Sequence, residues 1–110
     1  MEDTGHSVVH NSRASRFELV ANGHTARLEY RLAGDRIRLM HIEVPPELQG
    51  HRYSDDLARA GLEYAAREHL HVVPICPVVR AYLTRHPEFM PLVDERWREK
   101  LLTGRASTGS

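Results

Sequence analysis

The chain is 110 residues long, which is enough for one domain with a single core and too short for two ordinary domains. Its 15 acidic residues balance its 15 lysines and arginines, so non-specific binding to nucleic acid is not expected to be its main role. No apolar run is long enough to cross a membrane, and residues 1–10 lack the pattern of a signal peptide. The single cysteine cannot form an internal disulfide, which also favours a cytoplasmic protein.

The first 45 residues predict an antiparallel meander of β-strands. Apolar and polar residues alternate in three stretches that we expect to be strands, namely 8–21 (as one or two short strands), 25–32 and 36–44. Asn22-Gly23 and Gly34-Asp35 supply the turns, and Asn-Gly is a strong hairpin signal. In the last strand the apolar parity changes where Leu39 meets Met40, which predicts a β-bulge at that point.

From Ser54 onward the apolar period becomes helical. Ser54 is the expected N-cap of a helix that runs to about His69, with Asp55 and Asp56 in the first turn, where the helix dipole favours negative charge. A short apolar strand is expected over 71–75. Because a helix connects this strand to the meander, we expect it to lie parallel to an earlier strand.

The rest of the chain predicts two more helices and a polar end. Pro77 suits the first position of a helix that ends near Arg85. Residues 92–102 form the last expected helix, with Trp97 as its anchor. The small polar residues 103–110 are expected to be a disordered tail, which leaves residues 1–102 as a single domain. The predicted fold class is α+β, with one mixed sheet flanked by helices.

The loop 46–53 joins the end of a strand to the start of a helix. The free backbone N–H groups of a helix N-terminus bind anions, and Gly50 permits a close approach to this backbone. Gln49, His51 and Arg52 add side-chain donors. An anion-binding loop is therefore one interpretation, and a simple connecting loop is the other.

Cys76 and the pair of His41 and Glu43 are candidate catalytic side chains. Cys76 precedes a proline, so it is expected at a helix N-cap, where the dipole stabilises a thiolate; the alternative is a small buried apolar residue. His41 and Glu43 share one face of a strand near its C-terminal end, as a general base and its partner or as two solvated residues. His69 and His71 have no further ligand at metal-site spacing, so no metal is expected.

Several segments resemble those of one family. They are RFEL with ARLEYRL, then MHIEVPPELQG, and then LARAGLEYAAREHLHVVPICPVVRAYLTRHPEF. These segments are similar to the small single-domain GNAT-like N-acetyltransferases, and the resemblance covers about residues 8–93. Its most specific part is V-P-x-C-P at 73–77, followed by Y-x-x-x-H-P-E-[FY] at 82–89.

The resemblance implies a mixed sheet flanked by helices that binds acetyl-CoA as a co-substrate. In the wider superfamily, the end of the third strand and the next loop hold the pantetheine and the pyrophosphate, with a motif Q/R-x-x-G-x-G/A. On this chain Gln49 matches the motif, Arg52 replaces its first glycine, and Ser54 replaces its second small residue. The residues implied to bind the cofactor are Ile42, Val44, Gln49, Gly50, His51, Arg52, Tyr53, Ser54 and Arg85.

These departures from the motif have physical consequences. A non-glycine residue is disfavoured where φ is positive or where a phosphate lies against the backbone. The side chain of Arg52 either fills the phosphate pocket or replaces its contacts. Asp55 and Asp56 put negative charge beside an expected pyrophosphate, which weakens its binding.

The leading hypothesis is an acyltransferase that moves an acetyl group from acetyl-CoA to an amine. In direct transfer, Glu43 or His41 takes the amine proton; in a two-step route, Cys76 first carries the acetyl group. Tyr82 is expected to hydrogen-bond the departing thiol. The alternatives are a catalytically degenerate GNAT-fold binding or interaction module with weakened CoA binding, and a purely structural protein. The sequence does not specify the acceptor, no nucleic-acid or membrane partner is expected, and both a monomer and a homodimer are compatible with it.

Overall fold

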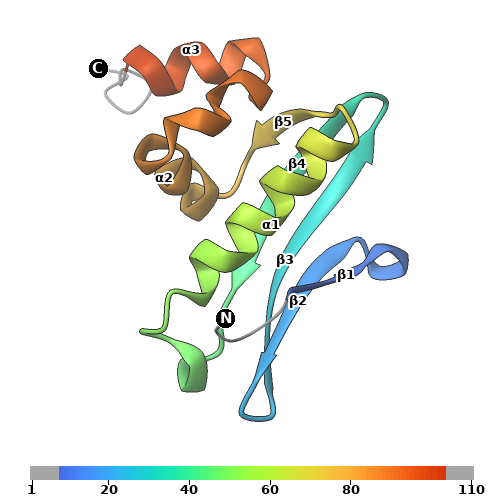
Figure 1. The fold of residues 1–110 in the computed structure, drawn as a ribbon, viewed down its shortest axis with the longest axis vertical. Helices are drawn as coiled ribbons and strands as arrows, with labels where there is room; N and C mark the ends of the chain where they lie inside the picture. Colours follow the sequence, from blue (N-terminus) through green and yellow to red (C-terminus); the bar gives the residue numbers. More distant parts are fainter. Residues whose placement is uncertain (1–7, 104–110) are drawn as a thin grey trace.

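The chain forms a mixed sheet of five strands in the order β1-β2-β3-β4-β5, with helices packed against it (Figure 1). The computed structural model describes residues 8–103. The strands are β1 (Val8–Asn11), β2 (Arg16–Ala21), β3 (His24–Ala33), β4 (Arg36–Glu43) and β5 (His71–Pro74). The helices are α1 (Tyr53–Arg67), α2 (Pro77–Arg85) and α3 (Glu95–Thr103), and the 3-10 turns are η1 (Ser12–Ala14), η2 (Pro46–Leu48) and η3 (Pro87–Leu92). The predicted α+β class is confirmed.

Strands β1 to β4 form the antiparallel meander that the sequence predicts. Asn22 (φ 51°) and Gly23 (φ 79°) make the turn between β2 and β3, a turn type that requires positive φ at both positions. Alternate side chains of these strands, such as Leu19 and Leu28, are fully buried on one face, which we call the inner face. The opposite side of the sheet is the outer face.

A β-bulge at Met40 interrupts the pairing of β3 and β4, as predicted. Tyr30 lies opposite Leu39, whereas the preceding residue on β3, Glu29, lies opposite His41, so Met40 is the extra residue. Side chains alternate between the two faces of a strand, and an extra residue reverses the alternation. His41 therefore lies on the outer face although Leu39, two positions earlier, is buried on the inner face.

Strand β5 lies parallel to β4, as expected from its helical connection. The two strands pair over residues 36–39 and 71–74. Just beyond the last of these pairs, the N–H of Cys76 donates a hydrogen bond to the carbonyl of Leu39 (2.9 Å). Strand β4 continues through residues 40–43. Within the described part of the chain, this end of β4 has no strand on its β5 side.

Helix α1 crosses the inner face of the sheet (Figure 1). Leu57 and Leu62 are fully buried in the core beneath it. Gly61 permits a close approach, because a Cβ at this position would lie 2.8 Å from Cδ2 of Leu28. Helices α2 and α3 lie at the β5 end of the sheet, and α2 packs against α1.

The start of α1 corrects one prediction. The N-cap is Arg52 rather than Ser54, and the Arg52 carbonyl accepts hydrogen bonds from the N–H groups of Asp55 (3.1 Å) and Asp56 (3.3 Å). Arg52 has a φ of 62°, in the left-handed region, and no side chain caps the helix. The turn of the loop, not a hydroxyl cap, therefore sets where this helix begins, and Ser54 lies inside its first turn.

The last helix begins later than predicted. Residue Val93 forms a parallel bridge with Val72 of β5, and the N–H of Asp94 donates to the Val72 carbonyl (2.8 Å). An extended residue cannot belong to a helix, so α3 starts at Glu95 rather than at residue 92. Trp97 packs against the core from α3.

Some expectations fall outside the described residues. Helix α3 ends at Thr103, and the rest of the expected polar tail, 104–110, lies beyond the described part. Most of the N-terminal segment, residues 1–7, also lies beyond it. Within the described residues, no helix has both the length and the apolar character to cross a membrane.

Candidate active site

The loop after β4 folds back against the strand end. Leu48 is buried, and Nε2 of Gln49 donates a hydrogen bond to the carbonyl of Val44 (3.1 Å). Gly50 has a φ of 90°, and apart from Gly50 and its two neighbours in the chain no heavy atom lies within 4 Å of the place that a Cβ would occupy. The half-buried Ile42 and Val44 lead into this loop. The backbone at Gly50 is thus open to a ligand on the side where its Cβ is missing.

The loop ends at the N-terminus of α1, which is suited to an anion. The first N–H groups of a helix have no acceptor inside the helix, and the dipole is positive at this end. The exposed His51 and Arg52 add side-chain donors there. The ring of His51 stacks on Tyr53, with 5.2 Å between the centroids, and Ser54 follows in the first turn. The structure therefore brings the residues of the expected motif together at one helix end.

Asp55 ties the start of α1 to the end of α2. Its carboxylate accepts two hydrogen bonds from the guanidinium of Arg85, at 3.0 and 3.2 Å. This bidentate pair holds the pKa of Asp55 below its usual range. Arg85 lies near the loop, but its charge is already matched by Asp55. Asp56 faces another way, where it lines a hollow together with Arg59.

Cys76 and Tyr82 are both buried, with 1% and 2% of their surface exposed. Cys76 is the N-cap of α2, as predicted, but its side chain makes no capping hydrogen bond and belongs to the apolar core. The ring of Tyr82 stacks on His86 at 4.2 Å. Burial raises the pKa of Tyr82, and the charge of Arg59 on α1 acts in the opposite direction. The buried setting agrees with the interpretation of Cys76 as a small apolar residue.

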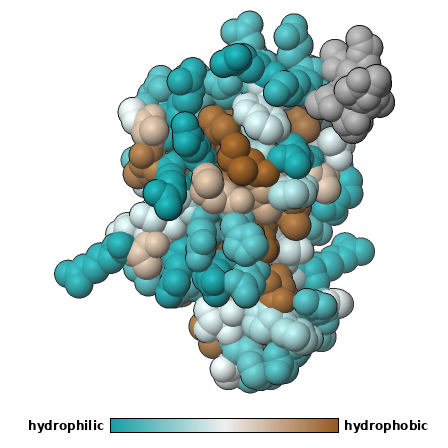
Figure 2. Space-filling view, turned by 180° about the vertical axis from the view of Figure 1, so that it is seen from behind, coloured by the Kyte–Doolittle hydropathy of each residue, from teal (hydrophilic) through white to brown (hydrophobic). Residues whose placement is uncertain are grey.

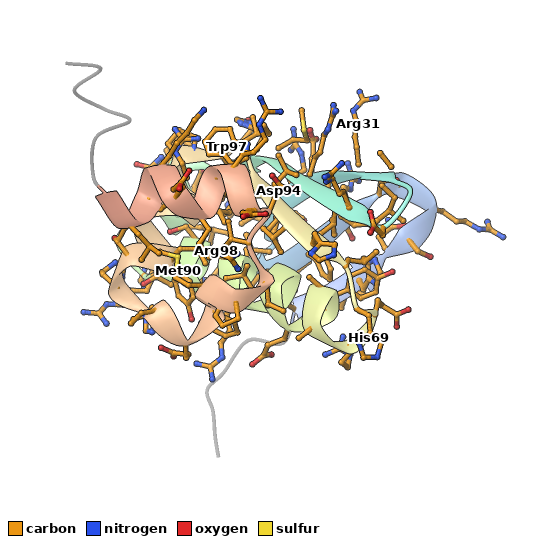
Figure 3. The ribbon with its side chains drawn as sticks, turned by 90° about the horizontal axis from the view of Figure 1, so that it is seen from above. Arg31, His69, Met90, Asp94, Trp97 and Arg98 are labelled. Atoms are coloured by element: carbon orange, nitrogen blue, oxygen red, sulfur yellow. The ribbon has the colours of Figure 1, made fainter. Side chains whose placement is uncertain are left out.

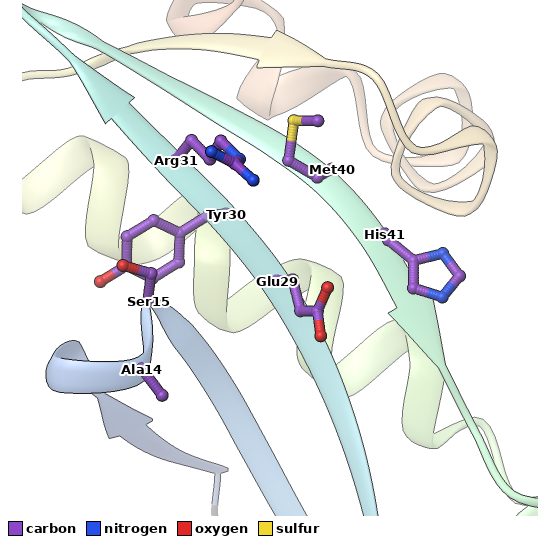
Figure 4. A pocket seen from close by; sticks show the side chains of 7 residues that line it. All are labelled: Ala14, Ser15, Glu29, Tyr30, Arg31, Met40 and His41. Atoms are coloured by element: carbon purple, nitrogen blue, oxygen red, sulfur yellow. The ribbon is translucent and has the colours of Figure 1, made fainter.

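His41 and Glu43 lie on the outer face of the sheet (Figure 4 shows His41). Their side chains are half exposed, and Nε2 of His41 is 3.9 Å from Oε1 of Glu43. Arg27 binds the carboxylate of Glu43 at 2.5 Å and that of Glu29 at 2.8 Å. His41 and Glu43 thus share a face, as expected, whereas Cys76 is enclosed in the core.

The site combines an open edge of β4, a loop that ends at a helix N-terminus, and ionisable side chains on the outer face. The chain matches the family described as GCN5-related N-acetyl-transferase over residues 16–92, from the start of β2 to the end of η3. The protein belongs to this family. At the level of the family its activity is acetyl transfer, for which GNAT proteins use acetyl-CoA. A comparison with curated proteins found no match.

The outer face of this GNAT protein has a hollow of about 550 Å³ that was not predicted from the sequence (Figure 4). Ser15 forms one wall, Met40 and His41 form another, and Glu29 and Arg31 lie between them. The sequence does contain a signal for part of this arrangement. A two-residue turn at 34–35 followed by a one-residue bulge places Glu29 opposite His41.

The described residues contain no group of three His, Cys, Asp or Glu side chains arranged to hold a metal ion. Most of the outer face is hydrophilic, with apolar residues gathered near its centre (Figure 2). Val73 of β5 and Ile75, which follows the strand, are partly exposed, and Met40 is half-buried.

Proposed function

We propose that this protein transfers the acetyl group of acetyl-CoA to an amine by direct attack. The observation that carries the proposal is the continuous path from the unpaired edge of β4, residues 40–43, to the N-terminus of α1. Pantetheine contains two amides, which can form hydrogen bonds with an unpaired strand edge in the same way that an added strand does. The pyrophosphate then lies at the helix N-terminus, where anions are stabilised.

The loop residues have distinct roles in this proposal. Arg52 and His51 offer exposed donors to the phosphates, and Gly50 lets the phosphates approach the backbone. Gln49 holds the loop against β4 through its hydrogen bond to the strand end. Arg85 matches the charge of Asp55, so this carboxylate repels the pyrophosphate less than an unpaired one does. Ile42, Val44, Tyr53 and Ser54 complete the contact surface.

The acceptor approaches from the outer face, where His41 is the proposed general base. The amine nitrogen forms a bond to the carbonyl carbon of the thioester, and the carbon–sulfur bond breaks. His41 takes the proton that the amine releases, and CoA leaves as a thiolate that takes up a proton. We prefer His41 to Glu43 because Arg27 already binds the Glu43 carboxylate. Backbone N–H groups near the bulge stabilise the oxyanion.

Direct attack is preferred to a route through Cys76 because the thiol is buried. Only 1% of the surface of Cys76 is exposed, and the close-packed apolar core around the sulfur has no space for an acetyl group. Tyr82, the expected donor to the departing thiol, is enclosed in the same core, with 2% of its surface exposed, so we assign it no contact with CoA in this proposal.

Calorimetric titration with acetyl-CoA and CoA tests the first step. We expect binding of both ligands, and consumption of acetyl-CoA when a panel of primary amines is added. No binding at millimolar ligand would overturn the proposal and favour a binding module that has lost catalysis. The single cysteine is compatible with a reducing compartment, and we propose the cytoplasm as the site of action.

Variants separate the chemical routes. His41→Gln is expected to lower kcat about a hundredfold, as removal of a general base does, with little change in CoA affinity. His71→Gln is a matched control, because His71 is also half exposed and lies 3.7 Å from a carboxylate, that of Asp35.

Cys76→Ala is expected to retain activity. If a folded Cys76→Ala variant is inactive and mass spectrometry finds acetyl-Cys76 in the parent protein, direct attack is wrong.

A further inference from the structure

Two arginines stand side by side on the outer face without an ion-pair partner among the described residues. Arg31 of β3 lies directly opposite Arg38 of β4, and both are exposed. Residues directly opposite each other have Cβ atoms about 5 Å apart, and like charges at this distance destabilise a sheet. Neither guanidinium is within ion-pair distance of a described carboxylate.

The other arginines of strands β2, β3 and β4 are paired, which makes Arg31 and Arg38 unlike them. The pairs are Arg16 with Glu18, Arg27 with Glu29 and Glu43, and Arg36 with Asp94. Charge compensation is therefore the rule on these strands. Arg31 and Arg38 are the exception, and they place two positive charges side by side. An anion is favoured at this point, because guanidinium groups bind carboxylates and phosphates through two parallel hydrogen bonds.

Arg31 lines the hollow that contains the proposed base, and Arg38 lies directly opposite Arg31 on β4. Arg31, Glu29 and His41 all line the hollow of about 550 Å³ (Figure 4). Arg31 and Glu29 are two residues apart on one face of β3, so their Cα atoms are separated by about 7 Å. Figure 3 shows Arg31 on the side of the sheet away from His69 and the end of α1. A single small molecule can thus reach Arg31 at one end and His41 at the other.

We propose that this hollow is the acceptor site and that the acceptor is a small amine carrying an anionic group, either a carboxylate or a phosphate. The inference rests on the proposed function and names the acceptor class. The guanidinium groups of Arg31 and Arg38 bind the anionic group, which directs the amine toward His41. Before it loses its proton, the ammonium group faces the carboxylate of Glu29. Amines with no anionic group meet two uncompensated positive charges and bind less well.

Matched acceptor pairs test the class. The probes are glycine with glycinamide, and O-phosphoethanolamine with ethanolamine. We expect the anionic member of at least one pair to have the higher kcat/KM, and the preferred pair tells a carboxylate from a phosphate. Glycinamide is a useful comparison because its amine resembles a peptide N-terminus, which loses its proton more readily than an ordinary alkylamine. A preference for glycine therefore cannot come from a more easily deprotonated amine.

Arginine variants test the assigned residues. Arg31→Gln and Arg38→Gln are each expected to raise KM for the anionic acceptor about tenfold, which is the effect of losing one charge-assisted hydrogen bond, while kcat changes little. KM for the neutral partner should stay the same or fall. Arg67→Gln, on the exposed side of α1, is the control and should change neither value. The variants should unfold at the same or a higher temperature than the parent, because they remove like-charge repulsion.

A binding experiment without acetyl-CoA separates this inference from the proposed function. Titration of the isotopically labelled protein with glycine and with O-phosphoethanolamine should shift the side-chain N–H signals of Arg31 and Arg38 in NMR spectra. If these signals shift but acetyl-CoA does not bind, the anion site stands and the acetyltransferase proposal fails. If acetyl transfer occurs equally with charged and neutral amines and the arginine variants have no effect, the acceptor assignment is wrong.

Discussion

Arg52 adopts a backbone conformation that usually belongs to glycine. Its φ of 62° lies in the left-handed region, which costs a non-glycine residue about 1 kcal/mol. The side chain is exposed and makes no capping hydrogen bond, although it stands at the N-terminus of α1. The proposed role of Arg52 in holding phosphate would account for a guanidinium at this position, since folding of the loop alone is easier with glycine.

Replacing Arg52 should therefore change stability and affinity in opposite directions. Arg52→Gly is expected to raise the free energy of unfolding by about 1 kcal/mol, because the backbone strain is removed. It should also weaken CoA binding about tenfold through the loss of a charge-assisted contact. Urea denaturation and calorimetry measure the two effects.

Arg52→Ala is the control for this pair of effects. It removes the same guanidinium but keeps a Cβ in the left-handed conformation, so CoA binding should weaken without the gain in stability. Tighter CoA binding by Arg52→Gly would instead mean that the arginine side chain obstructs the phosphate pocket.

Among the elements, β4 owes the orientation of His41 to one extra residue. Without the bulge at Met40, the alternation that buries Leu39 would place His41 on the inner face, beneath α1. With the bulge, His41 faces solvent beside Glu29, and Ile42 packs against the core instead. The mixed apolar parity of this strand in the sequence therefore reflects the bulge, which places the proposed base, His41, on the outer face.

Helix α1 ends through a second left-handed residue. His69 has a φ of 57°, the N–H of Leu70 donates to the Ala65 carbonyl (2.9 Å), and the N–H of His69 donates to the Ala66 carbonyl (3.3 Å). This pair of hydrogen bonds defines the Schellman motif, whose left-handed position is usually glycine. It explains why the helix stops at Arg67, two residues before the end predicted from the apolar period.

Glycine at this position should strengthen the helix end. His69→Gly is expected to raise the free energy of unfolding by about 1 kcal/mol, because the left-handed conformation no longer carries a Cβ penalty. Ala66→Gly is a matched control in the last turn of the helix and should lower the free energy by up to about 1 kcal/mol. Both values come from denaturant titrations, and a destabilised His69→Gly variant would show that His69 makes a contact worth more than the strain.

At the scale of the whole molecule, the features with local signals were predicted from the sequence. Asn22-Gly23 and strict alternation identify the meander, and the paired apolar residues Leu39 and Met40 locate the bulge. Pro77 marks the start of α2. The parallel strand follows from the length of the helical connection before it. Each of these signals lies within a few residues of the feature that it specifies.

The remaining features depend on residues that are distant in the chain. No local pattern indicates that Arg85 pairs with Asp55, or that Val93 extends the sheet beside Val72. The preference of serine for N-caps is worth about 1 kcal/mol, which is small enough for the loop geometry before Ser54 to override it. The outer-face hollow likewise requires the register of two strands and the position of the η1 turn together.

The edge of the sheet depends on a histidine packed among aromatic rings. His10 of β1 stacks on Phe17 at 4.4 Å, meets Tyr64 of α1 edge-on at 4.5 Å, and is joined to the hydroxyl of Tyr30 by a 2.6 Å hydrogen bond. These contacts connect the first strand to β3 and to the helix layer. Burial lowers the pKa of His10, and the charge of Arg67 lowers it further, while Glu68 opposes the shift.

Stability should therefore fall as the pH drops through the histidine range. Well above pH 6.5, His10 is neutral in both the folded and the unfolded protein. As the pH falls below about 6.5, His10 takes up a proton in the unfolded chain, whereas its lowered pKa keeps it neutral in the folded protein. The free energy of unfolding therefore decreases until the pH has passed the pKa of His10 in the folded state. Arginine partners lower the pKa values of three carboxyl groups, those of Glu18, Glu29 and Asp55. Protonation of these groups lowers the free energy of unfolding only at the more acidic pH values where carboxyl groups titrate. His10→Phe keeps the ring packing without a titrating group, so urea denaturation between about pH 7 and pH 5 should show a slope for the parent and a flatter profile for the variant. Equal slopes would mean that His10 does not couple the sheet edge to pH.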